Sequence, residues 1–274
     1  MDLYYFIKMK IYKYIQIKTK DNVLNIILNR PKKRNALNPI MIEEIHSVFK
    51  QNIKNDLINV IVLSSSSNVF CAGADLQYLN NISKNNYNQN LSDSKKLMKL
   101  FKTMLSFPKL IISKVVGPAI AGGCGIATAS DIIFCTPDSK FGYPEVKIGF
   151  IPALVSSFLK FKIKQSYINK LLLTGAIVSA KEAKEMGLVQ HIYNKNDINL
   201  EIDNFIQTQT ETTSSQSIAY TKKLLYELNN LDEKLNLAAQ YNAKIRDNDD
   251  FKLGVKSFLN KNSINWKKIK NDEV

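Results

Sequence analysis

The chain has 274 residues, 45% of them hydrophobic, which is enough for one large domain or for a main domain with an appendage. No stretch reaches the roughly 18 consecutive apolar residues of a membrane helix, and three irregularly spaced cysteines with two histidines argue against a disulfide framework and a metal site. The net charge of +14 comes from lysines spread over the whole chain, which argues against nucleic acid as the main partner and is compatible with an anionic, nucleotide-bearing substrate.

Two further features of the sequence indicate the cellular compartment of the protein. The odd number of cysteines without regular spacing favours a reducing environment. The first 18 residues interleave lysine with aromatic residues and lack the continuous apolar core of a secretory signal. We therefore expect a cytoplasmic protein.

Short apolar strands alternate with helical stretches through the first two-thirds of the chain, which is an α/β pattern. Apolar runs and alternations predict strands over residues 11–17, 23–29, 60–63, 111–116 and 132–135. The first is an edge strand that leads to a turn at Lys20, Asp21 and Asn22, and the third suits a strand buried on both faces. Helical spacing of apolar residues predicts helices over residues 38–52, 92–105 and 126–130. The asparagine-rich stretch 81–90 predicts a mobile surface loop.

The last third of the chain is predicted to be helical. Ser179 and Glu182 form a capping box that opens a helix ending near Gly187. After Asn194 the apolar strands disappear. Two helical stripes follow, made of Ile218, Leu225 and Leu228 and of Leu231, Leu235 and Ala238. We therefore divide the chain into a core at residues 1–196 and a helical region at residues 197–274.

Two segments rich in glycine and alanine end buried apolar stretches, at residues 70–76 (FCAGADL) and 119–125 (AIAGGCG). Tiny side chains let a ligand approach the backbone, so one amide from each segment could hold a carbonyl oxygen that gains negative charge. The dipole of the following helix would reinforce the N–H of Gly122. The first segment can instead be a tight strand-to-helix turn, with Asp75 as a helix N-cap. A dinucleotide loop is disfavoured, since its third glycine and its acidic residue are missing.

A third segment, residues 141–152 (FGYPEVKIGFIP), carries Glu145. Its neighbours Pro144 and Val146 favour a partly desolvated carboxyl group with a raised pKa, which suits acid–base catalysis. The alternative is a surface glutamate paired with Lys147. Oxyanion donors and one acid–base group are the minimum that enolate chemistry needs.

The order and spacing of these three segments closely resemble the crotonase (enoyl-CoA hydratase/isomerase) family. Two further stretches match that family, residues 29–38 (NRPKKRNALN) and residues 172–189, in which LLTG is followed by SAKEA and GLV. The resemblance implies a crotonase-like spiral of repeated ββα turns. It also implies that the C-terminal helical region builds homotrimers and often hexamers.

The same resemblance implies an acyl-CoA thioester substrate, whose carbonyl oxygen is bound by the amides of Ala74 and Gly122 and whose protons are moved by Glu145. Coenzyme A is part of this substrate, and no separate cofactor is expected. The family's coenzyme A contacts correspond to Lys33, Arg34 and Ala36 near the nucleotide and to Ala72, Asp75, Leu76 and Gln77 near the adenine and pantetheine. We expect the acyl pocket to be lined by Ile120, Tyr143, Phe150 and Leu154.

The chain departs from the best-known hydratases of this family at Gly125, where they carry a second catalytic glutamate. A glycine cannot transfer a proton, so Glu145 would act alone. Hydration of an α,β-unsaturated thioester is the leading hypothesis, because some hydratases of the family work with one glutamate and an ordered water. A Δ3,Δ2-enoyl-CoA isomerase with one proton shuttle is the alternative, and a non-catalytic RNA-binding or scaffolding homologue is the third hypothesis.

Overall fold

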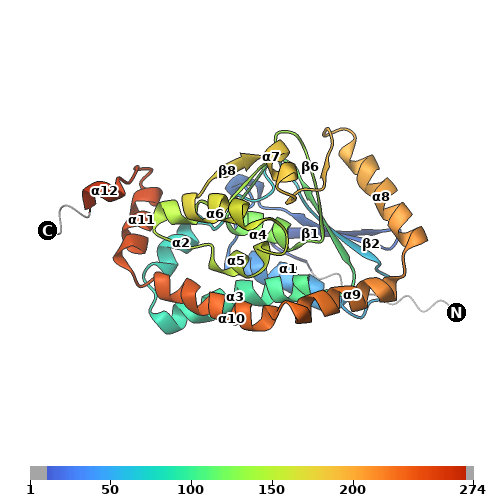
Figure 1. Ribbon diagram of the computed structural model, residues 1–274, viewed down its shortest axis with the longest axis horizontal. Helices are drawn as coiled ribbons and strands as arrows, with labels where there is room; N and C mark the ends of the chain where they lie inside the picture. Colours follow the sequence, from blue (N-terminus) through green and yellow to red (C-terminus); the bar gives the residue numbers. More distant parts are fainter. Residues whose placement is uncertain (1–10, 270–274) are drawn as a thin grey trace.

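Two β-sheets form the centre of the molecule, with helices around them (Figure 1). The computed structural model describes residues 11–269. The first ten residues of the N-terminal segment, for which we predicted no secretory signal, lie outside the described range. The larger sheet has the order β1-β2-β3-β4-β6-β9, formed by Ile15–Lys20, Val23–Leu28, Val60–Ser65, Leu110–Val115, Ile132–Cys135 and His191–Ile192. The smaller sheet has the order β5-β7-β8, formed by Pro118–Ile120, Lys140–Gly142 and Ile177–Ser179.

The chain winds through the two sheets as a spiral. Strands β3, β4 and β6 lie side by side and parallel in the larger sheet. After β4 and β6 the chain returns through β5 and β7, which pair in parallel in the smaller sheet. After β3 a single residue, Cys71, makes the equivalent parallel bridge to Ala119 of β5. A helical segment then ends each of the three turns, in agreement with the predicted spiral of ββα turns.

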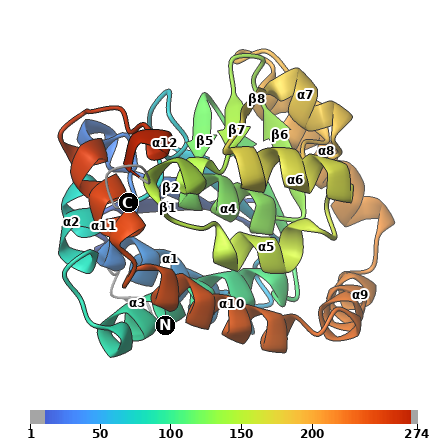
Figure 2. The same ribbon diagram turned by 60° about the vertical axis from the view of Figure 1, so that its left-hand side comes forward.

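Helices surround this spiral. In the first two-thirds of the chain they are α1 (Pro39–Asn52), α2 (Leu76–Ile82), α3 (Tyr87–Leu105), α4 (Gly122–Ala129), α5 (Ala153–Leu159), α6 (Gln165–Thr174) and α7 (Ala180–Glu185), with the 3-10 helices η1 (Pro31–Lys33) and η2 (Pro144–Ile148). The C-terminal helices are α8 (Ile198–Thr212), α9 (Ser215–Leu228), α10 (Leu231–Ile245), α11 (Asp249–Leu259) and α12 (Trp266–Ile269). Helices α3 and α10 run side by side along one edge of the molecule, while α2 and α11 meet at one end (Figure 2).

Most predicted elements occur with small changes of boundary. Strand 132–135 occurs as predicted, and β1 is an edge strand that begins at Ile15 rather than at residue 11. The predicted turn after it is a two-residue hairpin loop, because Lys20 pairs with Val23 while Asp21 and Asn22 have φ angles of 48° and 62°. Positive φ at both positions is typical of the type I′ turn, whose twist matches that of the two strands.

The prediction of a mobile loop over residues 81–90 is wrong. Helix α3 begins at Tyr87 and the stretch before it is short. Asn86 forms a capping box with Gln89, in which each side chain accepts a hydrogen bond from the other residue's backbone N–H. Asn90 is fully buried. Asparagine favours both loops and helix N-caps because its short side chain forms hydrogen bonds with nearby backbone groups. In this segment Asn86 has the N-cap role.

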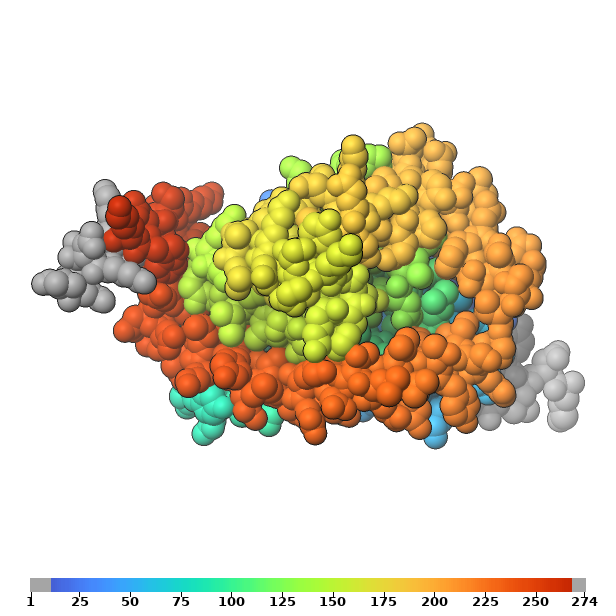
Figure 3. Space-filling view, in the orientation of Figure 1, coloured from blue at the N-terminus to red at the C-terminus, as the bar shows by residue number. Residues whose placement is uncertain are grey.

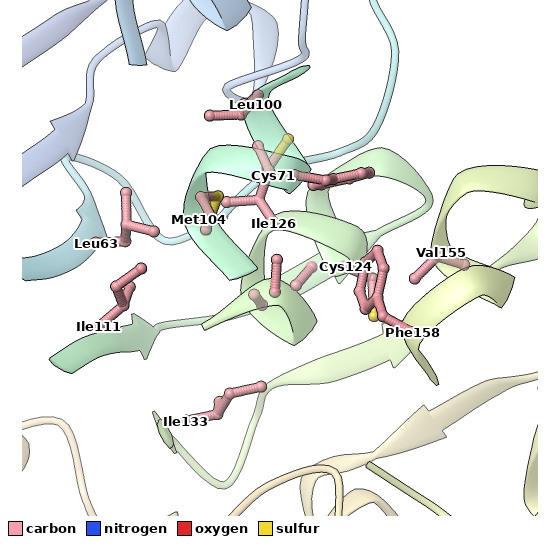
Figure 4. Close-up of a cluster of buried hydrophobic side chains, with 14 of the residues drawn as sticks. Leu63, Cys71, Leu100, Met104, Ile111, Cys124, Ile126, Ile133, Val155 and Phe158 are labelled. Atoms are coloured by element: carbon pink, nitrogen blue, oxygen red, sulfur yellow. The ribbon is translucent and has the colours of Figure 1, made fainter. Parts of the chain in front are cut away.

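Helix α4 lies in the middle of the hydrophobic core. Its glycine, alanine, cysteine and threonine side chains are small, so neighbouring elements can pack close on every side. Figure 4 shows Cys124 and Ile126 of α4 among side chains from the strands, the Cys71 bridge, α3 and α5, namely Leu63, Cys71, Leu100, Met104, Ile111, Ile133, Val155 and Phe158. The N-terminus of α4 is therefore held at a well-defined place.

The two apolar stripes predicted after residue 194 have different environments. In α10 the stripe is buried against α3 and α5. In α9 it faces outward, and Leu225 and Leu228 are 54% and 70% exposed. Figure 3 shows α9 and α10 as an orange band along one edge of the surface.

Within residues 11–269, no helix combines the length and the apolar character that crossing a membrane requires.

Candidate active site

The spiral aligns the three predicted segments, residues 70–76, 119–125 and 141–152, on successive turns. Cys71 pairs with Ala119, and Ala119 pairs with Phe141, so these residues stand in register across three successive turns. Ala74 and Gly122 each lie three residues beyond the paired position. Two positions that are 48 residues apart in sequence (122 minus 74) therefore emerge next to each other from the edge of the small sheet.

The backbone amides of Ala74 and Gly122 are free to bind a ligand. Within the described residues, neither N–H donates in the turn, loop and cap hydrogen bonds, and Gly122 opens α4, where first-turn N–H groups have no acceptor. The residues before them, Gly73 and Ala121, have φ angles of +92° and +51°. The left-handed backbone at Gly73 and Ala121 sets the orientation of the N–H group that follows each of them. For Ala121, which is not a glycine, this backbone conformation is strained. The α4 dipole adds positive potential at Gly122.

Glu145 follows Phe141 by four residues in the third turn, at the start of η2. The residue as a whole keeps partial exposure, whereas its carboxylate atom Oε2 is buried and has no hydrogen-bond partner. Burial raises the pKa of Glu145 to about 7. Within the described residues it forms no ion pair, so the alternative of a surface pair with Lys147 does not describe it.

Neighbouring elements hold Glu145 in place. Helix α11 lies directly against η2 at Gly254, where a Cβ atom would sit 2.1 Å from the carbonyl oxygen of Ile148. Tyr143, just before η2, is fully buried and shares a hydrogen bond of 2.6 Å with Thr128 of α4. Burial raises the pKa of Tyr143 well above its ordinary value, so its hydroxyl stays protonated. The wall behind Glu145 is therefore closely packed, and the protonated Tyr143 does not act as a second base.

Phe101 of α3 occupies the space beside Gly125. A Cβ atom placed on Gly125 would lie 2.9 Å from Cζ of this ring, closer than real contacts allow. The ring is buried and packs edge-on against Phe158 at a centroid distance of 5.3 Å. A second carboxylate at position 125 therefore has no room, and an aromatic ring stands where its side chain would point.

These residues line one cavity of about 1090 Å³, slightly larger than the usual range for ligand sites. Its wall contains the two free amides and Glu145. All four residues predicted for the acyl pocket also line it, namely Ile120, Tyr143, Phe150 and Leu154. Six of the residues predicted near coenzyme A do so as well, namely Lys33, Arg34, Ala36, Ala72, Asp75 and Leu76, whereas Gln77 is exposed on α2 and is not part of this wall.

Asp75 has the structural role that the sequence also allowed. It is the N-cap of α2 and accepts hydrogen bonds from the N–H groups of Gln77 and Tyr78. It also forms a 2.8 Å ion pair with Arg30. Burial opposes ionisation, but the bonds from Tyr78 and Arg30 outweigh it and lower the pKa of Asp75. This capped corner fixes the loop that carries Ala74.

Comparison with known proteins places these features in a family. A model of the family "Enoyl-CoA hydratase/isomerase" matches residues 18–270. The chain belongs to the enoyl-CoA hydratase/isomerase family. It is 35% identical to a putative enoyl-CoA hydratase of Thermus thermophilus over 88% of this chain and 96% of that protein. It is 28% identical to the peroxisomal Delta(3,5)-Delta(2,4)-dienoyl-CoA isomerase of Arabidopsis thaliana, over 95% and 99%.

A solved structure supports the same assignment. The crystal structure of an enoyl-CoA hydratase from Mycobacterium avium matches with a TM-score of 0.80 and 26% identity, covering 93% of this chain and all of that one. The predicted crotonase resemblance and the α/β fold of this enoyl-CoA hydratase/isomerase family member are thus confirmed. Hydratases and an isomerase both occur among its relatives, as the two leading hypotheses expected.

Several residues of the cavity were not found from the sequence. Phe101 belongs to a predicted apolar helix stripe, and no pattern placed it against Gly125. Asp93 and Arg246 line the cavity as an ion pair, although 153 positions separate them. Within the described residues, no group of three or more His, Cys, Asp and Glu side chains is arranged to hold a metal ion.

Proposed function

We propose that the protein adds water to the double bond of an α,β-unsaturated acyl-CoA thioester. The observation that carries this proposal is the state of Glu145. Three acidic residues of the described chain line the cavity, and two of them are ion-paired, Asp75 with Arg30 and Asp93 with Arg246, each at 2.8 Å. Glu145 alone among these three has an unpartnered, buried carboxylate oxygen.

The pKa of Glu145 suits both directions of proton transfer. At about 7, the carboxylate and the carboxylic acid are both populated near neutral pH. The carboxylate takes a proton from water as the water oxygen bonds to the β-carbon. The electron pair of the double bond moves through the α-carbon to the thioester oxygen. The protonated Glu145 then gives its proton to the α-carbon, so one water is added and the enzyme is regenerated.

The amides of Ala74 and Gly122 stabilise the charge that collects on the thioester oxygen in this step. They are preorganised by the backbone, so they need no reorientation when the enolate forms. Removing one such donor typically lowers the rate by ~10²–10³. The two donors come from different turns of the spiral and can approach one oxygen from two sides.

Coenzyme A binding is supported by the charge at the cavity wall. Lys32, Lys33 and Arg34 are exposed and line the cavity. Arg30 holds this basic loop through a 2.9 Å hydrogen bond to the carbonyl oxygen of Ala36. Cations at this position attract the phosphates of a nucleotide-bearing thioester. The substrate supplies the coenzyme, and no separate cofactor is part of this proposal.

Isomerisation of a 3-enoyl-CoA is the second candidate, and the Phe101–Gly125 contact favours it. A single carboxylate is sufficient to remove a proton from the α-carbon and to return it to the γ-carbon. The same two amides would stabilise the dienolate between these steps. Hydration differs in that a water must also fit beside Glu145.

The two reactions have opposite optical signals. Hydration of a 2-enoyl-CoA removes the ultraviolet absorbance of the conjugated thioester, whereas isomerisation of a 3-enoyl-CoA creates it. We expect the wild-type protein to consume 2-butenoyl-CoA and Glu145→Gln to lose at least about 10³-fold in kcat/KM. If the 2-enoyl ester is untouched while the 3-enoyl ester gains absorbance, hydration is excluded.

A matched control separates catalysis from a general effect of charge removal. Glu185 at the end of α7 is exposed and does not line the cavity, so Glu185→Gln makes the same chemical change outside the site. We expect this variant to keep wild-type rates. Equal activity of Glu145→Gln and Glu185→Gln with every enoyl-CoA would contradict the role of Glu145.

We also propose that the C-terminal helices join identical subunits, as the family resemblance suggests. The exposed apolar residues of α9 and α10 support this, namely Tyr220, Leu224, Leu225, Leu228, Leu237 and Tyr241. Light scattering should show a homotrimer or hexamer, and Leu225→Glu with Leu228→Glu should shift it towards the monomer. The division at residues 196 and 197 and the cytoplasmic location stay predictions.

A further inference from the structure

One part of the cavity wall is polar, although most of the wall around it is apolar. Arg246, the C-cap of α10, donates to Oδ2 of Asp93 at 2.8 Å and to Oδ1 of Asn242 at 2.7 Å. Tyr78 of α2 also donates to Asp93 Oδ2, and Ser94 of α3 donates to Asn242 Oδ1 at 2.7 Å. All five residues line the cavity, and we call them the polar cluster.

The polar cluster lies away from the reacting centre along α3. Phe101, Leu97, Ser94 and Asp93 all line the cavity from this one helix. Phe101 is the residue that touches Gly125. At 1.5 Å per residue, the eight positions from Phe101 to Asp93 correspond to about 12 Å. A chain that starts at the thioester and follows α3 therefore reaches the polar cluster at its far end.

The polar cluster has hydrogen-bonding capacity that the protein does not use. Arg246 is only 5% exposed, and its Nε atom is buried without a hydrogen-bond partner. Within the described residues, Asp93 Oδ1 and Asn242 Nδ2 form no hydrogen bond. Neither is among the buried unpartnered atoms, so both remain accessible. The Nε atom is out of reach of a ligand, whereas Asn242 Nδ2 can donate to a ligand oxygen and Asp93 Oδ1 can accept from a ligand hydroxyl.

Charge decides what kind of oxygen fits. Asp93 and Arg246 neutralise each other, so the polar cluster has no excess positive charge for a carboxylate. Burial and the neighbouring Asp93 raise the pKa of Tyr78, which therefore remains a neutral hydroxyl donor. A second carboxylate would be repelled by Asp93. A hydroxyl or keto oxygen can accept from Asn242 Nδ2 without that repulsion, and a hydroxyl can also donate to Asp93 Oδ1.

We propose that the polar cluster is a subsite for an uncharged, oxygen-bearing group near the far end of the acyl chain. This inference rests on the proposed function and narrows its substrate class to medium-chain 2-enoyl-CoA thioesters with a hydroxyl or keto substituent. An extended chain advances roughly 1.2 Å per bond, so a span of about 12 Å places this substituent roughly eight to ten carbons from the thioester.

The test compares four thioesters on the wild-type protein: 2-butenoyl-CoA, 2-decenoyl-CoA, 10-hydroxy-2-decenoyl-CoA and the matching ω-carboxylate. We expect kcat/KM for the hydroxy ester to exceed that for the methyl-terminated and carboxylate esters by about tenfold, the effect of one net hydrogen bond. Equal values for the hydroxy and methyl-terminated esters, or a preference for the methyl-terminated one, would overturn the subsite. A preference for the carboxylate would overturn the assignment of an uncharged group.

The same experiment separates this inference from the proposed function. Turnover of 2-butenoyl-CoA without a preference among the longer esters contradicts the subsite and leaves hydration standing. If no ester is hydrated, the proposed function fails. The subsite is then tested by calorimetric binding of saturated 10-hydroxydecanoyl-CoA against decanoyl-CoA, again with about a tenfold preference expected.

A variant pair adds a test of the residue itself. Asn242→Leu keeps the approximate volume and removes the free amide donor, so the ratio of hydroxy to methyl-terminated kcat/KM should fall to near one. Asn236→Leu, on the exposed side of the same helix, should keep the wild-type ratio. An unchanged ratio in a folded Asn242→Leu protein counts against the inference. If that variant does not fold, the wild-type substrate series still decides.

Discussion

Replacing Glu145 by glutamine should stabilise the folded protein at neutral and alkaline pH while it abolishes catalysis. Burial raises the pKa of this carboxyl group from 4.5 to about 7, and its Oε2 atom has no hydrogen-bond partner. At 1.36 kcal/mol per pKa unit, that difference corresponds to roughly 3 kcal/mol. The residue keeps partial contact with the cavity, so we expect about 2 kcal/mol of additional stability in the variant.

The additional stability of the Glu145→Gln variant should depend on pH in a defined direction. Below about 4.5 the carboxyl group is protonated in both the folded and the unfolded chain, and burying it costs little. Between 4.5 and about 7 the unfolded chain ionises first, so the wild-type protein loses stability as pH rises. Above about 7 the carboxyl group is ionised in both the folded and the unfolded chain, so the stability that the wild-type protein has lost no longer changes with pH. Glutamine is neutral throughout, so the stability difference opens over this interval.

Urea unfolding of the wild type, Glu145→Gln and the surface control Glu185→Gln at pH 8 and pH 4.5 measures this directly. We expect a difference of about 2 kcal/mol between the wild type and Glu145→Gln at pH 8, and below about 0.5 kcal/mol at pH 4.5. The control should match the wild type at both values. A difference that is equal at the two pH values, or a glutamine variant less stable than the wild type at pH 8, would refute the reasoning.

Three further substitutions, at Gly73, Gly125 and Lys33, test other parts of the site, and Gly187→Ala serves as a control. Gly73→Ala should lower kcat/KM by ~10²–10³, because the left-handed backbone and the Ala121 Cβ, 3.1 Å from the new atom, displace the Ala74 amide. Gly187→Ala, with φ of +86° and more room, should cost stability without changing the rate. Gly125→Ala should destabilise by about 1–3 kcal/mol, and less in a Phe101→Leu background, as a double-mutant cycle of unfolding energies would show. Lys33→Gln should raise KM about three- to fivefold at an unchanged kcat, with a smaller effect at high salt in steady-state assays.

The elements that the sequence predicts well are those set by local chemistry. The strand at 132–135 and the strand buried on both faces at 60–63 follow from continuous apolar residues. The capping box of Ser179 occurs as predicted, since both of its partners lie within four residues. The loop over 81–90 was predicted wrongly because asparagine serves loops and helix caps equally well, and the choice depends on the helix that follows.

The candidate site likewise combines features that the sequence predicts with features that only the tertiary structure shows. Glycine and alanine at 70–76 and 119–125, and a glutamate between apolar neighbours, are local patterns that indicate free amides and an acid–base group. Their meeting depends on the register of three stacked turns, in which Cys71, Ala119 and Phe141 pair. The Phe101 ring against Gly125 and the Arg246–Asp93 pair join residues far apart in the chain. Such contacts exist only once the turns have stacked and α10 has docked on α3, because packing between distant segments leaves no periodic or local signal in the residues themselves.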